Sequence, residues 1–237
     1  MGEDNSNQPN SIEGRLRITL PPIQLQGRGK VRSNLAIHHL MAAAYYARKS
    51  GELEREHAGK NFGEFWDEIL WNVSAAVLFG AAALEADANE IFSYPELSFP
   101  ESDPLLIDQI WALVEMDSIL DKYDMALFLK RKQHLDKGVI AYQDADSLIK
   151  LRNALVHFKP EWNDEKKAHK KLEQRLSGKF PLSPFLPTDA EFFPKKCMSH
   201  GCAEWAVRTA FAFRTAFSTD SGLPDKFAPF LSRMSTK

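Results

Sequence analysis

Apolar residues recur at intervals of three and four along most of this chain, which is the spacing of one face of an α-helix. Residues 62–92 contain the clearest example. There a single stripe of apolar positions consists of Leu70, Val73, Val77, Ala81, Leu84, Ala88 and Ile91. Small residues crowd the middle of the segment and permit close approach of a neighbouring helix. The pattern predicts one long helix over 62–92 with a buried face.

Weaker stripes of the same spacing predict further helices, and turn-forming residues set their ends. Asn34 can cap the helix expected over 34–52, and Asp103 can cap a helix that starts at Pro104. Pro160 stops the helix expected over 143–158. Residues 180–195 hold four prolines and predict a rigid, non-helical crossing. The other expected helices cover roughly 34–52, 104–116, 118–134, 143–158, 163–177, 200–218 and 224–234.

The first 33 residues follow a different pattern. Residues 1–12 are polar, and residues 15–26 hold a short β-like run broken by Pro21 and Pro22. Such a run forms at most an edge strand or an extended arm. We therefore expect an all-α protein, in which an antiparallel helical bundle spans 34–237 as one domain and a polar tail with an extended arm precedes it over 1–33.

Composition narrows the class of protein. The chain has 237 residues, of which 44% are hydrophobic and 26% charged, as in soluble globular domains. A net charge of -2 excludes a general nucleic-acid coat, because no overall positive field attracts phosphate. Two cysteines cannot form a disulfide framework and favour a reducing, cytoplasmic setting. We see no signal peptide and no run of about 18 uncharged apolar residues, so we predict no membrane partner.

Residues that can perform chemistry gather near the end of the helix expected over 143–158. Arg152 can bind phosphate through two N–H groups and stabilise developing charge. His157 titrates near neutral pH and can move protons, and the helix C-terminus favours its cationic form. Asn153 can orient either group through hydrogen bonds. A cation, an amide and an imidazole in this order suit phosphodiester cleavage without a metal.

Helix geometry sets a condition on this site. Arg152 and His157 lie about 140° apart around a helix, so one helix alone directs them apart. A composite site at a twofold interface, with residues from two copies of the chain, resolves this difficulty. The alternative is an exposed helix end where the histidine only complements the helix dipole.

A local positive charge surrounds these residues. Residues 150–180 contain nine basic and four acidic side chains. A net charge of +5 next to aromatic residues can attract and stack RNA, whereas the simpler explanation is a solvated helix face. The candidate RNA-binding residues are Lys150, Lys159, Trp162, Lys166 and Lys167.

Cys197, His200 and Cys202 form the one short cluster of potential metal ligands that we weighed. Structural zinc usually takes four ligands at other spacings. We therefore interpret the cysteines as ordinary thiols and predict no metal and no cofactor.

The string from Arg152 through Asn153 to His157 resembles the Arg-polar-x3-His signature of the HEPN superfamily. Glu85 and Asn89 are similar to the Glu-x3-Asn pair on that family's first core helix, and 200–218 resembles its closing helix. The resemblance covers about 62–219. It implies an α-helical bundle, commonly dimeric, which in many members is a metal-independent endoribonuclease that uses the RNA 2'-hydroxyl as nucleophile.

The resemblance gives each residue an expected role and leaves alternatives open. Arg152, Asn153 and His157 are the expected catalytic residues of an RNA-cleaving homodimer. Glu85 and Asn89 are expected to orient Arg152, or else to tie two helices together. Many HEPN proteins are toxins or phage-defence effectors, so an antitoxin or defence partner is possible. The alternative is a non-catalytic scaffold, or a nucleotide- or RNA-binding module, in a toxin–antitoxin or defence assembly.

Overall fold

The computed structural model describes residues 23–26, 30–161 and 167–237, and the chain divides into two units, 1–33 and 34–237. In the first unit, β1 (Ile23–Gln26) pairs antiparallel with β2 (Lys30–Ser33). The sequence pattern anticipates a strand up to Gln26 but not its partner β2. The described residues of 1–33 thus form a two-stranded hairpin. β1 begins directly after Pro22, since proline has no N–H to donate to a ladder.

The second unit is helical, so the chain is mainly α, as its apolar spacing predicts. Its long helices are joined mostly by short connections. The elements are α1 (Ala36–Glu56), α2 (Phe65–Phe92), α3 (Pro95–Ser98), α4 (Pro104–Val114), α5 (Ile119–Leu129), α6 (Ile140–Val156), α7 (Lys167–Leu176), the short turn η1 (Phe192–Lys196), α8 (His200–Ser221) and the 3₁₀ helix η2 (Ala228–Met234).

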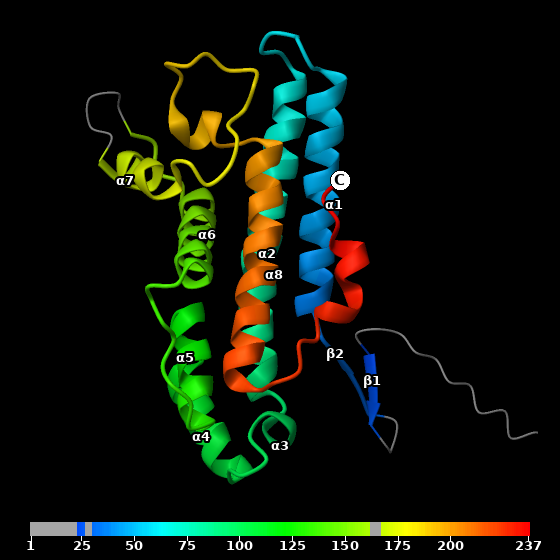
Figure 1. The fold of residues 1–237 in the computed structure, drawn as a ribbon, viewed down its shortest axis with the longest axis vertical. Helices are drawn as coiled ribbons and strands as arrows, with labels where there is room; N and C mark the ends of the chain where they lie inside the picture. Colours follow the sequence, from blue (N-terminus) through cyan, green and yellow to red (C-terminus); the bar gives the residue numbers. More distant parts are fainter. Residues whose placement is uncertain (1–22, 27–29, 162–166) are drawn as a thin grey trace, which may run out of the picture. The chain divides into compact units, whose positions relative to one another are not determined.

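Helix α2 is the centre of this unit. It packs against α1 and α8, which also touch each other, and α5 and α6 add to one side of this three-helix core (Figure 1). The predicted apolar stripe explains the packing, since Val73, Val77 and Leu84 are completely buried. At Gly80 a Cβ atom would lie 3.4 Å from the carbonyl oxygen of Ala206, which is ordinary van der Waals contact, so α2 and α8 pack directly against each other here.

Helix α2 is relevant to the prediction that no segment of the chain crosses a membrane. By length and composition alone it is apolar enough to cross a bilayer, although the sequence pattern predicts no such segment. The same test is passed by core helices of soluble proteins. Of its most apolar window, 44% is buried inside the protein.

Several helix ends differ from the predicted ones. Asp103 caps α4 as expected, and its carboxylate accepts a hydrogen bond from the Leu105 N–H at 2.9 Å. Asn34 does not cap α1; its Oδ1 accepts a hydrogen bond from the Tyr94 hydroxyl at 2.7 Å instead. Helix α6 begins three residues earlier than predicted, and the crossing expected over 180–195 contains the turn η1. Tertiary contacts decide these ends, and local spacing does not record them.

Candidate functional site

Arg152 faces the neighbouring helix α2. Its Nη2 lies 3.2 Å from Oε2 of Glu85, and the two side chains are 23% and 43% exposed. The Nε atom of Arg152 is buried without a hydrogen-bond partner in the described chain. Glu85 therefore holds one edge of a guanidinium that is still partly open to solvent. A guanidinium fixed in this way is suited to bind a phosphate oxygen.

His157 lies at the other side of α6, where the helix ends. It is the residue that follows Val156, and its N–H donates to the carbonyl of Asn153 at 2.9 Å. The side chains of His157 and Asn153 are both exposed. Within the described residues no hydrogen bond or ion pair joins His157 to Arg152. One chain therefore presents the two groups on different sides of α6, as the angle of about 140° around the helix requires.

Asn89 does not reach Arg152, contrary to one of its two expected roles. Its Oδ1 accepts a hydrogen bond from Nζ of Lys122 on α5 at 3.0 Å. Lys122 is 3% exposed and lies 5.3 Å from the ring centre of Trp111. Asn89 thus joins α2 to α5, and Glu85 alone of the expected pair contacts Arg152.

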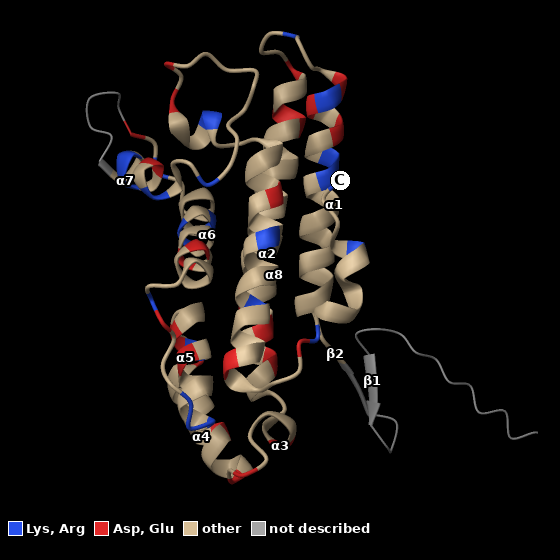
Figure 2. Ribbon diagram, in the orientation of Figure 1, with Lys and Arg blue, Asp and Glu red and all other residues tan. Residues whose placement is uncertain are grey.

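The predicted RNA-binding residues have different surroundings. Lys150 pairs with Asp146 at 2.6 Å, and Lys159 is exposed. Trp162 and Lys166 lie outside the described residues, as does the side chain of Lys167. Figure 2 shows basic positions on α7 and both acidic and basic positions on α6, and Arg175 of α7 pairs with Asp146 of α6 at 2.5 Å. Part of the local positive charge is therefore balanced by carboxylates.

A buried ionic cluster lies between α2, α5 and α8, and our sequence interpretation did not include it. Asp87 is completely buried, with its Oδ2 2.7 Å from Nε of Arg214 and its Oδ1 2.7 Å from Nζ of Lys226. The Tyr123 hydroxyl donates to Oδ2 of Asp87 at 2.7 Å. Lys226 also pairs with Glu90.

The surroundings of Asp87 act on its carboxyl in opposite directions. Burial acts to raise its pKa, but the charges of Arg214 and Lys226 outweigh burial and hold the pKa below its ordinary value. Burial raises the pKa of Tyr123, and the charge of Asp87 adds to this. The sequence does contain a signal for the cluster. Asp87 and Arg214 interrupt apolar stripes, and a charge on a buried face needs a partner.

Cys197, His200 and Cys202 do not form a metal site. Both cysteines are buried, and burial raises the pKa of each thiol. Nδ1 of the His200 ring lies 3.0 Å from the carbonyl oxygen of Ala47. The backbone N–H of His200 donates a hydrogen bond to Oε1 of Glu54 at 2.7 Å. Over the part of the chain that the structure describes, no three His, Cys, Asp or Glu side chains are placed to hold a metal ion.

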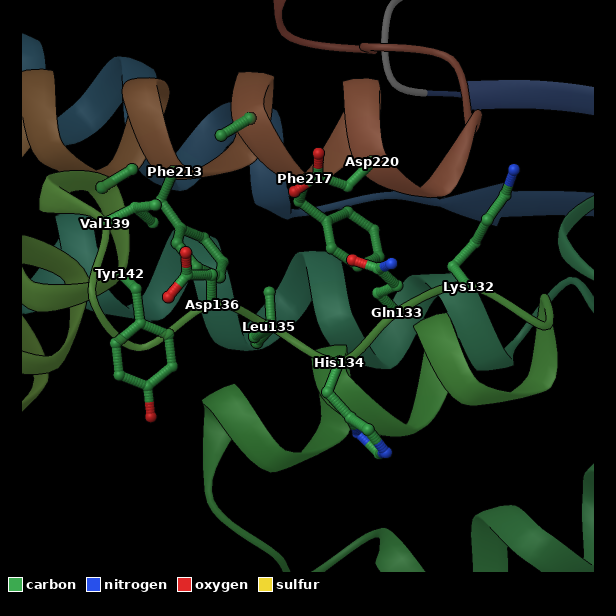
Figure 3. Close-up of a pocket in the computed structure, with 12 residues that line it drawn as sticks. Lys132, Gln133, His134, Leu135, Asp136, Val139, Tyr142, Phe213, Phe217 and Asp220 are labelled. Carbon is green, nitrogen blue, oxygen red and sulfur yellow. The ribbon is translucent and has the colours of Figure 1, made fainter.

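A cavity of about 440 Å³ lies between the loop that follows α5 and helix α8 (Figure 3). Phe213 and Phe217 line it, and Asp136, Asp220 and Lys132 contribute charge. None of the residues predicted for catalysis or RNA binding lines this cavity. Two carboxylates against one lysine disfavour a phosphate-bearing ligand here.

The described residues thus bring Glu85 to Arg152, leave Asn153 and His157 accessible, and separate Asn89 from the site. Comparisons with protein-family models, with curated proteins and with solved structures give no match to this chain.

Proposed function

We propose that this chain is a HEPN-like endoribonuclease that cleaves RNA without a metal ion and works as a cytoplasmic homodimer. The observation that carries the proposal is the ion pair of Arg152 with Glu85, next to exposed Asn153 and His157 on the same helix. An arginine fixed by a carboxylate can stabilise the charge that develops on the phosphate, and an accessible imidazole can transfer protons.

The proposed reaction is attack of an RNA 2'-hydroxyl on the adjacent phosphorus. The 2'-oxygen bonds to phosphorus as the bond to the 5'-oxygen of the next nucleotide breaks. Arg152 stabilises the charge on the phosphate oxygens. His157 either accepts the proton of the 2'-hydroxyl or protonates the leaving 5'-oxygen, and water carries out the other of these two proton transfers. Asn153 orients the reacting groups, and the products are a 2',3'-cyclic phosphate and a 5'-hydroxyl.

The outer face of α2 supports the dimer. Alternating steps of four and three residues connect the half-buried or exposed positions Trp71, Ala75, Leu78 and Ala82, and the next step of three reaches Glu85, which contacts Arg152 of α6. This spacing is typical of helices that pack against a partner helix. Trp71 is 65% exposed. A second copy packed on this row would cover Trp71 and bring two Arg152–Glu85 pairs to one interface.

The direct test is cleavage of single-stranded RNA by purified protein in EDTA. We expect Arg152→Ala and His157→Ala each to lower kcat by at least 10²-fold, which is the usual range for a transition-state donor or a general acid. Lys49→Ala, a change of an exposed cation on α1, is the matched control. An oligonucleotide of 2'-deoxynucleotides must remain intact. Equal cleavage by wild type and both variants would overturn the proposal.

The second candidate function is a non-catalytic HEPN-like scaffold in a toxin–antitoxin or defence assembly, which binds RNA, a nucleotide or a protein partner. It is favoured by one observation. In the described chain, no hydrogen bond orients the His157 side chain, whereas general acids are usually held by a partner. The scaffold predicts a dimer whose partner binding is unchanged by His157→Ala.

A further inference from the structure

A groove of about 600 Å³ separates α6 from α7. It is lined by the cations Lys150, Lys171 and Arg175, by Gln174, and by the small or aliphatic side chains of Ala154, Ala168 and Leu172. A groove that combines cations with apolar side chains is suited to an anionic chain.

Two contacts fix the position of α7 on α6. At one end Nη1 of Arg175 lies 2.5 Å from Oδ2 of Asp146. At the other end the rings of Phe158 and His169 stack with their centres 5.7 Å apart. The low residue numbers of α6 therefore meet the high numbers of α7, and the groove lies between the two contacts.

The groove ends next to the candidate site. Around the axis of α6, His157 lies about 20° from Lys150, and Ala154 lies about 40° from Lys150, so the three residues share one side of the helix. Phe158, which forms the second contact with α7, follows His157 directly. A chain lying in the groove would therefore reach His157 at one end.

The three cations of the groove differ in whether a carboxylate already pairs with them. Asp146 pairs with both Lys150 and Arg175 at 2.6 and 2.5 Å, and the three side chains are 25%, 47% and 40% exposed, respectively. Lys171 is exposed and has no carboxylate partner within the described residues. Three cations against one carboxylate leave a positive groove in which Asp146 holds two of the cations near each other.

We propose that this groove binds the phosphate backbone of single-stranded RNA beside His157, and that Asp146 limits its affinity by competing with phosphate for Lys150 and Arg175. The proposal rests on the proposed function, since it names the substrate strand of that site. Single-stranded RNA fits because a flexible strand can enter a concave groove. Among the described residues no aromatic side chain lines the groove, so the contacts expected from these residues are to phosphates and vary little with base sequence.

The test is fluorescence anisotropy of the full chain with a 2'-O-methyl single-stranded oligonucleotide, which binds but cannot be cleaved, at several salt concentrations. Each phosphate contact to a single strand contributes about 0.7 to the slope of log K against log salt. We expect Lys171→Ala to lower that slope by about 0.7 and to weaken binding about fivefold at 0.1 M salt. Arg175→Ala should weaken binding in the same direction, and Lys171→Glu should weaken it more than Lys171→Ala.

Asp146→Asn gives the opposite and more specific result. It releases Lys150 and Arg175, so we expect tighter binding and a steeper salt slope. Lys49→Ala is the matched control and should change neither quantity. The proposal is wrong if Lys171→Ala and Asp146→Asn both bind the oligonucleotide as wild type does. It is also wrong if an RNA duplex binds with the same dependence on these variants. A third contradicting result is displacement of the oligonucleotide by polyglutamate at equal charge concentration. The last result would identify the groove as a site for an acidic protein segment.

Cleavage assays separate this proposal from the proposed function. If both hold, Lys171→Ala lowers kcat/KM and leaves kcat at saturating RNA unchanged. If the oligonucleotide binds with the predicted variant pattern but wild type cleaves no RNA, the groove is supported and the enzyme is not. If wild type cleaves RNA and no groove variant alters binding or kcat/KM, the groove proposal alone fails.

Discussion

Glu85 and Arg152 are 67 residues apart in the chain, and their side chains meet at 3.2 Å between α2 and α6. The pair fixes one edge of the only arginine in the candidate motif. Its geometry makes Glu85 a positioning residue, since the carboxylate acts on Arg152.

Removing the charge of Glu85 should therefore affect turnover more than binding. For Glu85→Gln we expect kcat for RNA cleavage to fall about tenfold, which corresponds to about 1.4 kcal/mol of transition-state stabilisation, with KM nearly unchanged. Glu85→Asp should restore part of the loss. The exposed carboxylate of Glu56 on α1 offers a control, since Glu56→Gln should cleave as wild type does. A larger change in KM than in kcat would contradict the positioning role.

Removing one partner of the Asp87–Arg214 pair should strongly destabilise the helical unit. Asp87→Asn leaves Arg214 buried with an unbalanced charge, so we expect the free energy of unfolding to fall by about 3–5 kcal/mol. Urea unfolding followed by circular dichroism measures the change. Asp108→Asn, on the exposed side of α4, is the matched control. Replacing both partners by apolar residues, as in Asp87→Leu with Arg214→Met, should recover much of the loss.

The lowered pKa of Asp87 also sets how this contribution depends on pH. The folded protein binds the proton less tightly than the unfolded chain, whose ordinary aspartate pKa is 3.8. The contribution is therefore complete above that value and is lost as the pH falls through the lower folded pKa. Wild type should accordingly lose more stability in acid than Asp87→Asn does. Parallel stability curves for the two proteins below pH 4 would contradict this assignment.

Glu54 should show the opposite pH dependence. Burial raises its pKa above the ordinary value of 4.5, although the His200 N–H acts against this. The folded state then prefers the protonated form, so Glu54 costs stability as the pH rises above 4.5. We expect Glu54→Gln to gain stability relative to wild type between acidic and neutral pH, as its amide oxygen can still accept the hydrogen bond. Chemical unfolding at several pH values measures the difference. A constant difference from pH 3 to pH 8 would contradict this prediction.

The two thiols should be unreactive in the folded protein. Cys197 and Cys202 are both buried, and burial raises the pKa of each, so little thiolate forms at neutral pH. We expect no thiol to react with Ellman's reagent in native buffer and both to react in urea. Ser177→Cys, at an exposed position after α7, should react at once in the native protein. Fast reaction of wild-type thiols with the reagent in the absence of denaturant would contradict the burial of Cys197 and Cys202.

The sequence by itself determined the class of the fold and the faces of its helices. Apolar residues at intervals of three and four decide which side of a helix avoids water, and this information is local. It correctly predicts the buried stripe of α2 and the cap at Asp103. It is less reliable at helix ends, since Asn34 bonds to Tyr94 instead of capping α1.

Only the tertiary structure decided which side chains meet between helices. The same local pattern that places Glu85 and Asn89 on one face cannot state that Glu85 reaches Arg152 and that Asn89 reaches Lys122. It likewise cannot pair Asp87 with Arg214. These pairs depend on how far each helix is shifted and rotated against its neighbours, and that arrangement follows from the packing of the whole core.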